Sequence, residues 1–186
     1  MYNRIMTMTL KPQDVVILLK LCGYTSQIRP SYAIIASELS MSPSEIHSAV
    51  KRLILSRLVN GSEMGEQVNL TAAEEFLIHG VKYSFPEERG GMTRGIPTSY
   101  AAEPLNRLIK AGDEPIPVWA CSNGTARGIA VVPLYKTVPK AALRDSILYE
   151  RLALIDAIRG GRARERNLAE KELKNSLRQI YGESKS

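Results

Sequence analysis

The chain has 186 residues, enough for one folded domain with an appendage, and its hydrophobic share of 44% and charged share of 24% are typical of a soluble globular protein. Two distant cysteines, no apolar run long enough to span a bilayer and no continuous apolar segment near the N-terminus favour a cytoplasmic protein with free thiols. The net charge of +6, most of it in residues 136–186, favours an anionic partner such as nucleic acid.

The first forty residues predict two helices. Apolar residues three and four apart (Val15, Leu18, Leu19 and Cys22) indicate one buried face of a helix that starts near Leu10 and ends at Gly23, with Thr9 as candidate N-cap. A second helix is expected over residues 31–39, followed by a short turn at Ser40 and Met41.

A third helix is expected over residues 43–58. Its start, Ser42-Pro43-Ser44-Glu45, has the pattern of a capping box with proline in the first helical position. Ile46, Val50, Leu53 and Leu58 would form its buried stripe, which leaves a face of small and basic residues at Ser44, His47, Ser48, Lys51 and Arg52. Short hydroxyl side chains allow close approach to bases and phosphates, so this face is expected to enter the major groove of DNA.

Val59 and Val68 could begin and end a two-stranded hairpin, and Thr71 is the candidate N-cap of a fourth helix. The stretch IIASELSMSPSEIHSAVKRLILSRLV resembles the winged helix-turn-helix of bacterial transcription regulators of the MarR type, and Ala49, Arg52, Leu53, Leu58 and Val59 match that family's pattern. The resemblance covers roughly residues 10–80, and Ser40 replaces the glycine often found in the turn. It implies a DNA-binding domain, although winged helices also serve as protein-binding modules.

The middle of the chain predicts less regular structure. Residues 83–104 contain three prolines and three glycines and are expected to form an irregular arm, in which Arg89 and Arg94 either contact phosphates or are solvated in a linker. Residues 116–135 predict a β-hairpin with its tight turn at Asn123-Gly124, anchored to the core by Trp119.

Two amphipathic helices are expected at the C-terminal end, over residues 146–158 and 162–181. The apolar stripe of the first, with Leu148, Leu152, Ile155 and Ile158, either forms a homodimer interface or closes the core of one chain. The arginines between the helices, Arg162, Arg164 and Arg166, either hold phosphates or an acidic partner, or line a solvated turn.

The sequence therefore predicts a mainly α-helical protein with a small β part (α+β), divided into residues 1–82, 83–136 and 137–186. The expected function is a dimeric DNA-binding repressor. The candidate DNA contacts are Ser42, Ser44, His47, Ser48, Lys51, Arg52, Arg89, Arg94, Arg162, Arg164 and Arg166. No catalytic or metal-ligand motif is present in the sequence, so neither an enzyme nor a cofactor is expected.

Two other functions stay open. The part from residue 83 onward resembles unassigned helix-turn-helix proteins encoded beside nucleotidyltransferase-like toxins, which implies an antitoxin-type module that neutralises a partner enzyme and represses its own operon. The other is a ligand-responsive regulator, with a small molecule held between the winged helix and the C-terminal helices.

Overall fold

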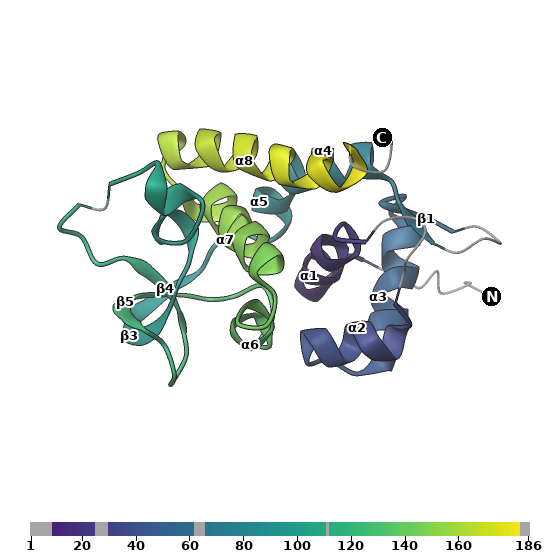
Figure 1. Ribbon diagram of the computed structural model, residues 1–186, viewed down its shortest axis with the longest axis horizontal. Coiled ribbons are helices and arrows are strands. Elements are labelled where there is room, and N and C mark those ends of the chain that lie inside the picture. The colour runs from purple at the N-terminus through teal and green to yellow at the C-terminus, as the bar shows by residue number, and fades with distance from the viewer. Residues whose placement is uncertain (1–8, 25–29, 62–65, 111, 183–186) are drawn as a thin grey trace, which may run out of the picture.

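The computed structural model describes residues 9–24, 30–61, 66–110 and 112–182 and is mainly α-helical with a small β part, as predicted. The first helices lie at one end of an elongated molecule, and three strands lie at the other (Figure 1). Helix α7 occupies the middle, and α8 runs along one long side over both ends (Figure 1).

The N-terminal end contains three helices: α1 (Pro12–Leu21), α2 (Tyr32–Leu39) and α3 (Pro43–Leu55). Helix α1 is buried on nearly every side, because it packs against α3 on one side and α7 on the other. Its N-cap is Lys11 rather than the predicted Thr9, since Asp14 accepts the Lys11 backbone N–H and Pro12 follows directly. Helix α3 begins at the predicted capping box.

A two-stranded hairpin follows α3, as expected, with Val59 of β1 (Val59–Asn60) opposite Val68 of β2 (Gln67–Val68). The expected tip of the hairpin, residues 61–66, lies partly outside the described residues. The next helix is continuous from α4 (Leu70–Glu75) through a π-helical turn (Phe76–Gly80) to α5 (Val81–Ser84). Asn69 caps it instead of Thr71, because the Asn69 side chain accepts the N–H of Ala72.

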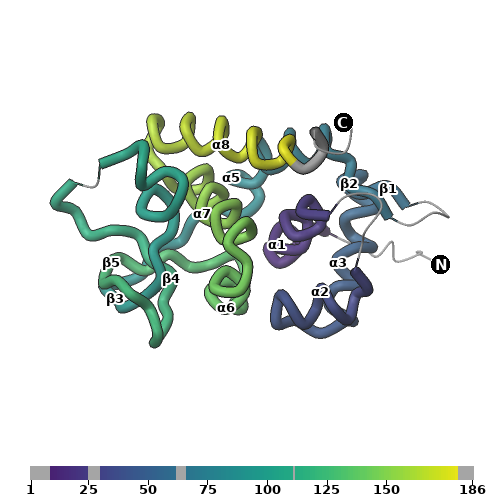
Figure 2. Tube along the Cα trace, viewed as in Figure 1, coloured from purple at the N-terminus to yellow at the C-terminus, as the bar shows by residue number. Residues whose placement is uncertain are grey.

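The expected irregular arm is wrong over much of its length, because β3 (Arg89–Pro97) is a nine-residue strand. The expected hairpin is also wrong. Strands β4 (Pro117–Ala120) and β5 (Ala126–Val131) both pair antiparallel with β3 and are therefore parallel to each other, closing a three-stranded barrel. Figure 2 shows the path of the backbone through the barrel, at the end of the molecule opposite α1, α2 and α3.

Glycines explain why the barrel resembled loop sequence. A Cβ atom on Gly95 would lie 2.1 Å from the Trp119 carbonyl oxygen, and one on Gly128 would lie 1.9 Å from the Ile116 carbonyl oxygen. These glycines therefore mark places where backbones cross closely within a sheet, and not a flexible arm.

The C-terminal third consists of the short α6 (Val138–Ala142), α7 (Ser146–Gly160) and α8 (Ala163–Gly182). Helix α7 is buried from Leu148 to Ile158 except at Tyr149 and Glu150, because α1, α5, α6 and α8 all pack on it. The apolar stripe on which the homodimer was predicted is therefore covered within one chain. The homodimer stays a prediction, without that support.

Two buried charged residues of α7 join the parts of the molecule. Asp156 accepts hydrogen bonds from Trp119 Nε1 at 2.7 Å and from Thr98 Oγ1 at 2.8 Å, which confirms Trp119 as a core anchor. Burial raises the pKa of Asp156, while Arg159, at 2.7 Å, stabilises its ionised form. Arg151 donates to the carbonyl oxygens of Leu19 in α1 and Ser176 in α8.

Candidate nucleic-acid interface

The start of α3 is held by reciprocal capping. The Ser42 Oγ accepts the N–H of Glu45 at 3.3 Å, and a Glu45 carboxylate oxygen accepts the N–H of Ser42 at 2.8 Å. This cap satisfies two backbone donors, fixes the entry to the helix and places a carboxylate near its positive end. Ser42 therefore has a structural role, although its side chain lies at the exposed start of the helix.

One side of α3 is exposed and polar. Its exposed members, Ser44, His47, Ser48 and Lys51, will be called the polar face. The opposite side, with Ile46, Ala49, Val50 and Leu53, is fully buried. Figure 1 shows α3 at the end of the molecule farthest from the barrel.

Arg52 does not belong to the exposed face, which corrects the prediction. Its guanidinium lies inside the N-terminal end, where Nε and Nη2 are 2.7 and 2.6 Å from the two carboxylate oxygens of Asp14. Both residues are buried, and the two-point contact joins α3 to α1. Arg52 is therefore a core residue, and its guanidinium is occupied by Asp14.

Two residues that do not stand out in the sequence adjoin the polar face. The Tyr32 ring at the start of α2 lies 5.9 Å from the His47 ring, and the Tyr32 hydroxyl donates to Glu66 beside the hairpin. Leu55 follows Lys51 by four residues, so it extends the same face, and its side chain is exposed. The spacing of Leu55 was a usable signal, whereas the position of Tyr32 depends on how α2 crosses α3.

The turn before α3 is braced from the second half of the chain. Ser40 has φ 54° and ψ 42°, the left-handed conformation that explains why glycine is common in this turn. Arg144, just before α7, donates to the Ser40 hydroxyl and to the Ser37 carbonyl oxygen, both at 3.2 Å. The Tyr135 hydroxyl donates to Glu45, and this hydrogen bond lowers the pKa of the Glu45 carboxyl together with those from Ser42.

The other predicted arginines are not gathered with α3. Arg94 donates to the Gly124 carbonyl oxygen at 2.8 Å and so holds the β4–β5 connection, while Arg89 pairs with Glu87. Arg162 pairs with Glu114 at 2.7 Å. Strand β3 and the start of α8 lie at the barrel end of the molecule (Figure 1), so Arg89, Arg94 and Arg162 are remote from the polar face.

Arg89 and Arg162 instead line one pocket of about 820 Å³ at the barrel end. Its apolar wall includes Tyr100, Ile109 and Ile129. The lining carries both cationic groups and carboxylates, including Glu165. This pocket is not between the helix-turn-helix and the C-terminal helices, where a ligand was expected. A smaller pocket of about 400 Å³ does lie there, between Lys20 and Glu38 on one side and Arg144 and Asp145 on the other.

Of the remaining arginines in this cluster, Arg164 is exposed and Arg166 is half-buried. The C-terminal half of α8 lies over α4, unlike the start of the helix. There the Glu74 carboxylate forms one contact with Lys174 and two with Arg178, each 3.0 Å long. These two cations do not stand out in the sequence, since their relation to the N-terminal end depends on how α8 packs.

The two cysteines are not joined by a disulfide bond. Both Cys22 and Cys121 are free thiols, and burial raises the pKa of Cys22 to about 12, which keeps it protonated. Within the described ranges, no group of three or more His, Cys, Asp or Glu side chains could hold a metal ion. No helix in the described part of the chain combines the length and apolar composition that a bilayer crossing requires.

Comparisons with family models, curated proteins and solved structures find no match for this chain.

Proposed function

We propose that this chain is a DNA-binding transcription regulator that reads the major groove with the polar face of α3. The observation that carries the proposal is the exposure of Ser44, His47, Ser48 and Lys51 on one side of a firmly capped helix. A helix with short hydroxyl groups near its N-terminus can approach base edges closely, and a lysine one turn later can bind a phosphate or a guanine edge.

The elements around α3 support the same interpretation. Helix α2 packs across α3, and the β1–β2 hairpin follows directly, in the order expected of a winged helix-turn-helix. The net charge of +6 favours association with a polyanion. In this proposal the protein acts in the cytoplasm as a repressor. If it is a dimer, the half-sites should repeat at about one helical turn, roughly 34 Å.

Selection of bound DNA from a random pool with the full chain tests the proposal. We expect a reproducible sequence motif to be enriched. The same selection with His47→Ala should enrich the motif more weakly, because the variant loses a contact to a base edge. Enrichment of no motif by the wild-type chain would reject sequence-specific DNA binding.

A protein-interaction function is the second candidate, and the barrel end favours it. This end is not needed for a helix-turn-helix. It exposes the large apolar side chains of Met92 and Val132, and it contains the mixed-charge pocket. The antitoxin-type hypothesis places a partner enzyme on this end, with α3 left for the operator. A co-purified enzyme whose activity the chain suppresses would support it, and the Met92→Glu and Val132→Glu variants should then lose suppression while the DNA motif is retained.

A further inference from the structure

One face of α8 carries cations and amides but no carboxylates. Its four cations, spaced seven, three and four residues apart, will be called the α8 basic stripe: Arg164, Lys171, Lys174 and Arg178. All four are exposed, and this spacing places them on one side of the helix. The opposite side, with Ala169, Leu173 and Leu177, is buried against the rest of the molecule.

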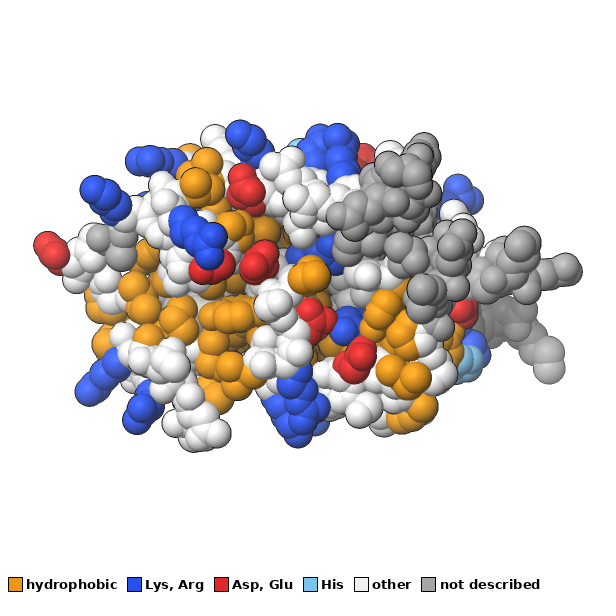
Figure 3. Space-filling model, in the orientation of Figure 1, with side chains coloured by type: hydrophobic (Ala, Val, Ile, Leu, Met, Phe, Trp, Pro, Cys, Tyr) orange, Lys and Arg blue, Asp and Glu red, His pale blue; other side chains and the backbone are white. Residues whose placement is uncertain are grey.

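The residues between the cations suit a polar ligand. Asn167, Asn175 and Gln179 are exposed on the same side, and amides donate hydrogen bonds to phosphate oxygens. The carboxylates of α8, at Glu165, Glu170 and Glu172, are half-buried and lie toward its flanks. Lys and Arg side chains line the upper edge of the molecule in Figure 3, where α8 lies in Figure 1.

The stripe has two parts with different surroundings. Lys174 and Arg178 share Glu74 of α4, which offsets part of their charge but holds both head groups in place. Burial opposes the ionised form of Glu74, but the hydrogen bonds from Arg178 and Lys174 outweigh it and lower the pKa of the carboxyl. Among the described residues, neither Arg164 nor Lys171 has an ion pair, so both charges are available to a ligand.

The length and position of the stripe fit a nucleic-acid backbone. From Arg164 to Arg178 the helix rises by about 21 Å, since each residue adds about 1.5 Å, and this distance corresponds to about six base pairs of duplex. The stripe ends beside α4, which directly follows the β1–β2 hairpin in the chain. A duplex that contacts α3 and the hairpin could therefore continue toward α8.

We infer that the α8 basic stripe binds the phosphate backbone of duplex DNA outside the segment read by α3. This inference rests on the proposed function for the identity of the ligand. It assigns to α8 a contact that is independent of base sequence and adds to affinity in proportion to the phosphates bound. Of the predicted cluster around Arg162, only Arg164 belongs to this stripe, and the packing of α8 reveals the other three members.

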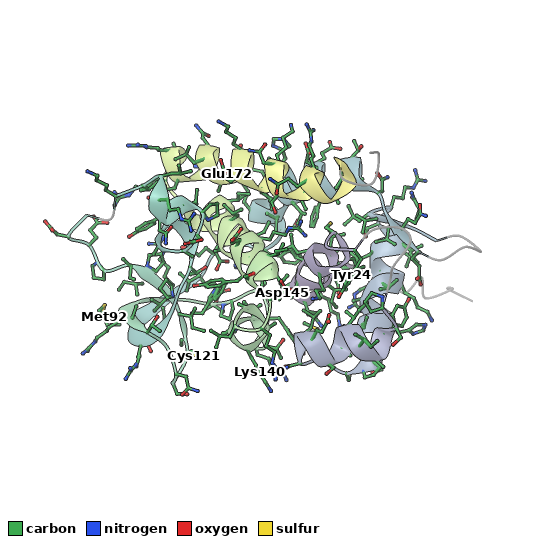
Figure 4. All side chains as sticks on the ribbon, viewed as in Figure 1. Tyr24, Met92, Cys121, Lys140, Asp145 and Glu172 are labelled. Atoms are coloured by element: carbon green, nitrogen blue, oxygen red, sulfur yellow. The ribbon has the colours of Figure 1, made fainter. Side chains whose placement is uncertain are left out.

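The test compares the salt dependence of binding to a random-sequence duplex by two variants of equal charge. Arg164→Gln with Lys171→Gln removes the two cations without ion pairs and leaves the Glu74 contacts intact. Arg127→Gln with Lys140→Gln is the matched control, because both residues are exposed on β5 and α6. Figure 4 labels Lys140 at the edge of the molecule opposite α8.

In a plot of log affinity against log salt, we expect the stripe variant to reduce the slope by about 2, close to 0.9 for each phosphate that the variant no longer neutralises. The control should keep the wild-type slope. Adding Lys174→Gln and Arg178→Gln should reduce the slope further, but by less than another 2, because Glu74 already offsets part of their charge. Equal slopes for the stripe variant and the control would overturn the inference, and so would a wild-type chain that binds no duplex.

Failure here is distinct from failure of the proposed function. Selection of a sequence motif tests α3, whereas the slope on random-sequence duplex tests α8. A motif that is selected equally well by the stripe variant, with an unchanged slope, would leave α3 as the reader and reject α8. A reduced slope without any selected motif would keep the α8 contact and reject sequence-specific regulation.

Discussion

The guanidinium of Arg52 is bound at two points by the carboxylate of Asp14, 38 residues earlier in the chain, and both are shielded from water. Removing one partner of a buried pair leaves the other as an uncompensated charge. We expect Arg52→Met to lower the free energy of unfolding by about 3–5 kcal/mol, measured by urea denaturation. The exposed neighbour is the control, and Lys51→Met should change stability little; a decrease of less than about 1 kcal/mol for Arg52→Met would place the pair among weak surface contacts.

Substitutions on the polar face should distinguish contacts to bases from contacts to the phosphate backbone. A good bidentate base contact contributes roughly 1–3 kcal/mol to discrimination, and the single contacts available to His47 and Ser48 should contribute toward the lower end. We expect His47→Ala and Ser48→Ala to narrow the affinity gap between a selected site and a shuffled one, measured by competition binding. Lys51→Ala should lower affinity for both duplexes similarly. Unchanged affinity and selectivity in all three folded variants would assign the polar face to a protein partner.

Arg162 should contribute little to DNA binding, although it is part of the densest basic segment in the sequence. Its guanidinium is engaged by Glu114 and lines the barrel-end pocket. We expect Arg162→Ala to leave the salt slope on random-sequence duplex unchanged, whereas Arg164→Ala should reduce it by about 1. A reduction for Arg162→Ala as large as that for Arg164→Ala would return Arg162 to the interface.

The close backbone crossing in the barrel predicts opposite effects for two glycines of β3. A side chain at Gly95 would collide with the Trp119 carbonyl group, whereas nothing lies within 4 Å of a Cβ atom at Gly91. We expect Gly95→Ala to lower the free energy of unfolding by about 3 kcal/mol or more, at the upper end for overpacked sites. Gly91→Ala should leave the free energy of unfolding unchanged or raise it slightly. Thermal melts of both variants and the wild type check these expectations. Equal melting temperatures for the Gly95→Ala and Gly91→Ala variants would show that the backbones at Gly95 and Trp119 have room for a side chain.

A cluster around Lys20 predicts sensitivity to acid. Lys20 lies 2.7 Å from an Asp145 oxygen and 3.0 Å from a Glu38 oxygen, and Figure 4 labels Asp145 between the two ends of the molecule. Burial alone would raise the pKa of both carboxyls, but hydrogen bonds outweigh it and lower both values: those to Asp145 come from Lys20 and Leu148, and those to Glu38 from Tyr24 and Lys20.

Because these carboxyls have lower pKa values in the folded state, their contribution to stability is complete above about pH 4–5, where the unfolded chain is also ionised. The contribution is lost as the pH falls through the lowered pKa values. Lys20→Met should therefore destabilise the protein at pH 7, and the difference from wild type should shrink below about pH 4 in urea titrations. A difference that is constant between pH 7 and pH 3 would contradict the assignment.

Local patterns predicted the helices and the start of α3 well, because capping boxes and apolar spacing depend on neighbouring residues. The same patterns failed where distant backbones meet. Gly95 looked like part of a loop because its partner, Trp119, is 24 residues away, and Arg52 looked exposed because its partner lies on α1. The polar face was predictable from spacing alone, whereas the α8 basic stripe required knowledge of which side of α8 is buried.

The burial of α7 also has a consequence for how the protein unfolds. Helix α7 touches α1 and α5 from the first 84 residues and α8 from the last third, and Arg151 donates hydrogen bonds to groups from both. Asp156 joins α7 to the barrel end through Thr98 and Trp119. A fragment ending near residue 85 would lack α7, and much of the surface of α1 would then be exposed to water. The described elements should thus melt in one concerted transition, and the N-terminal end should not fold as an autonomous module.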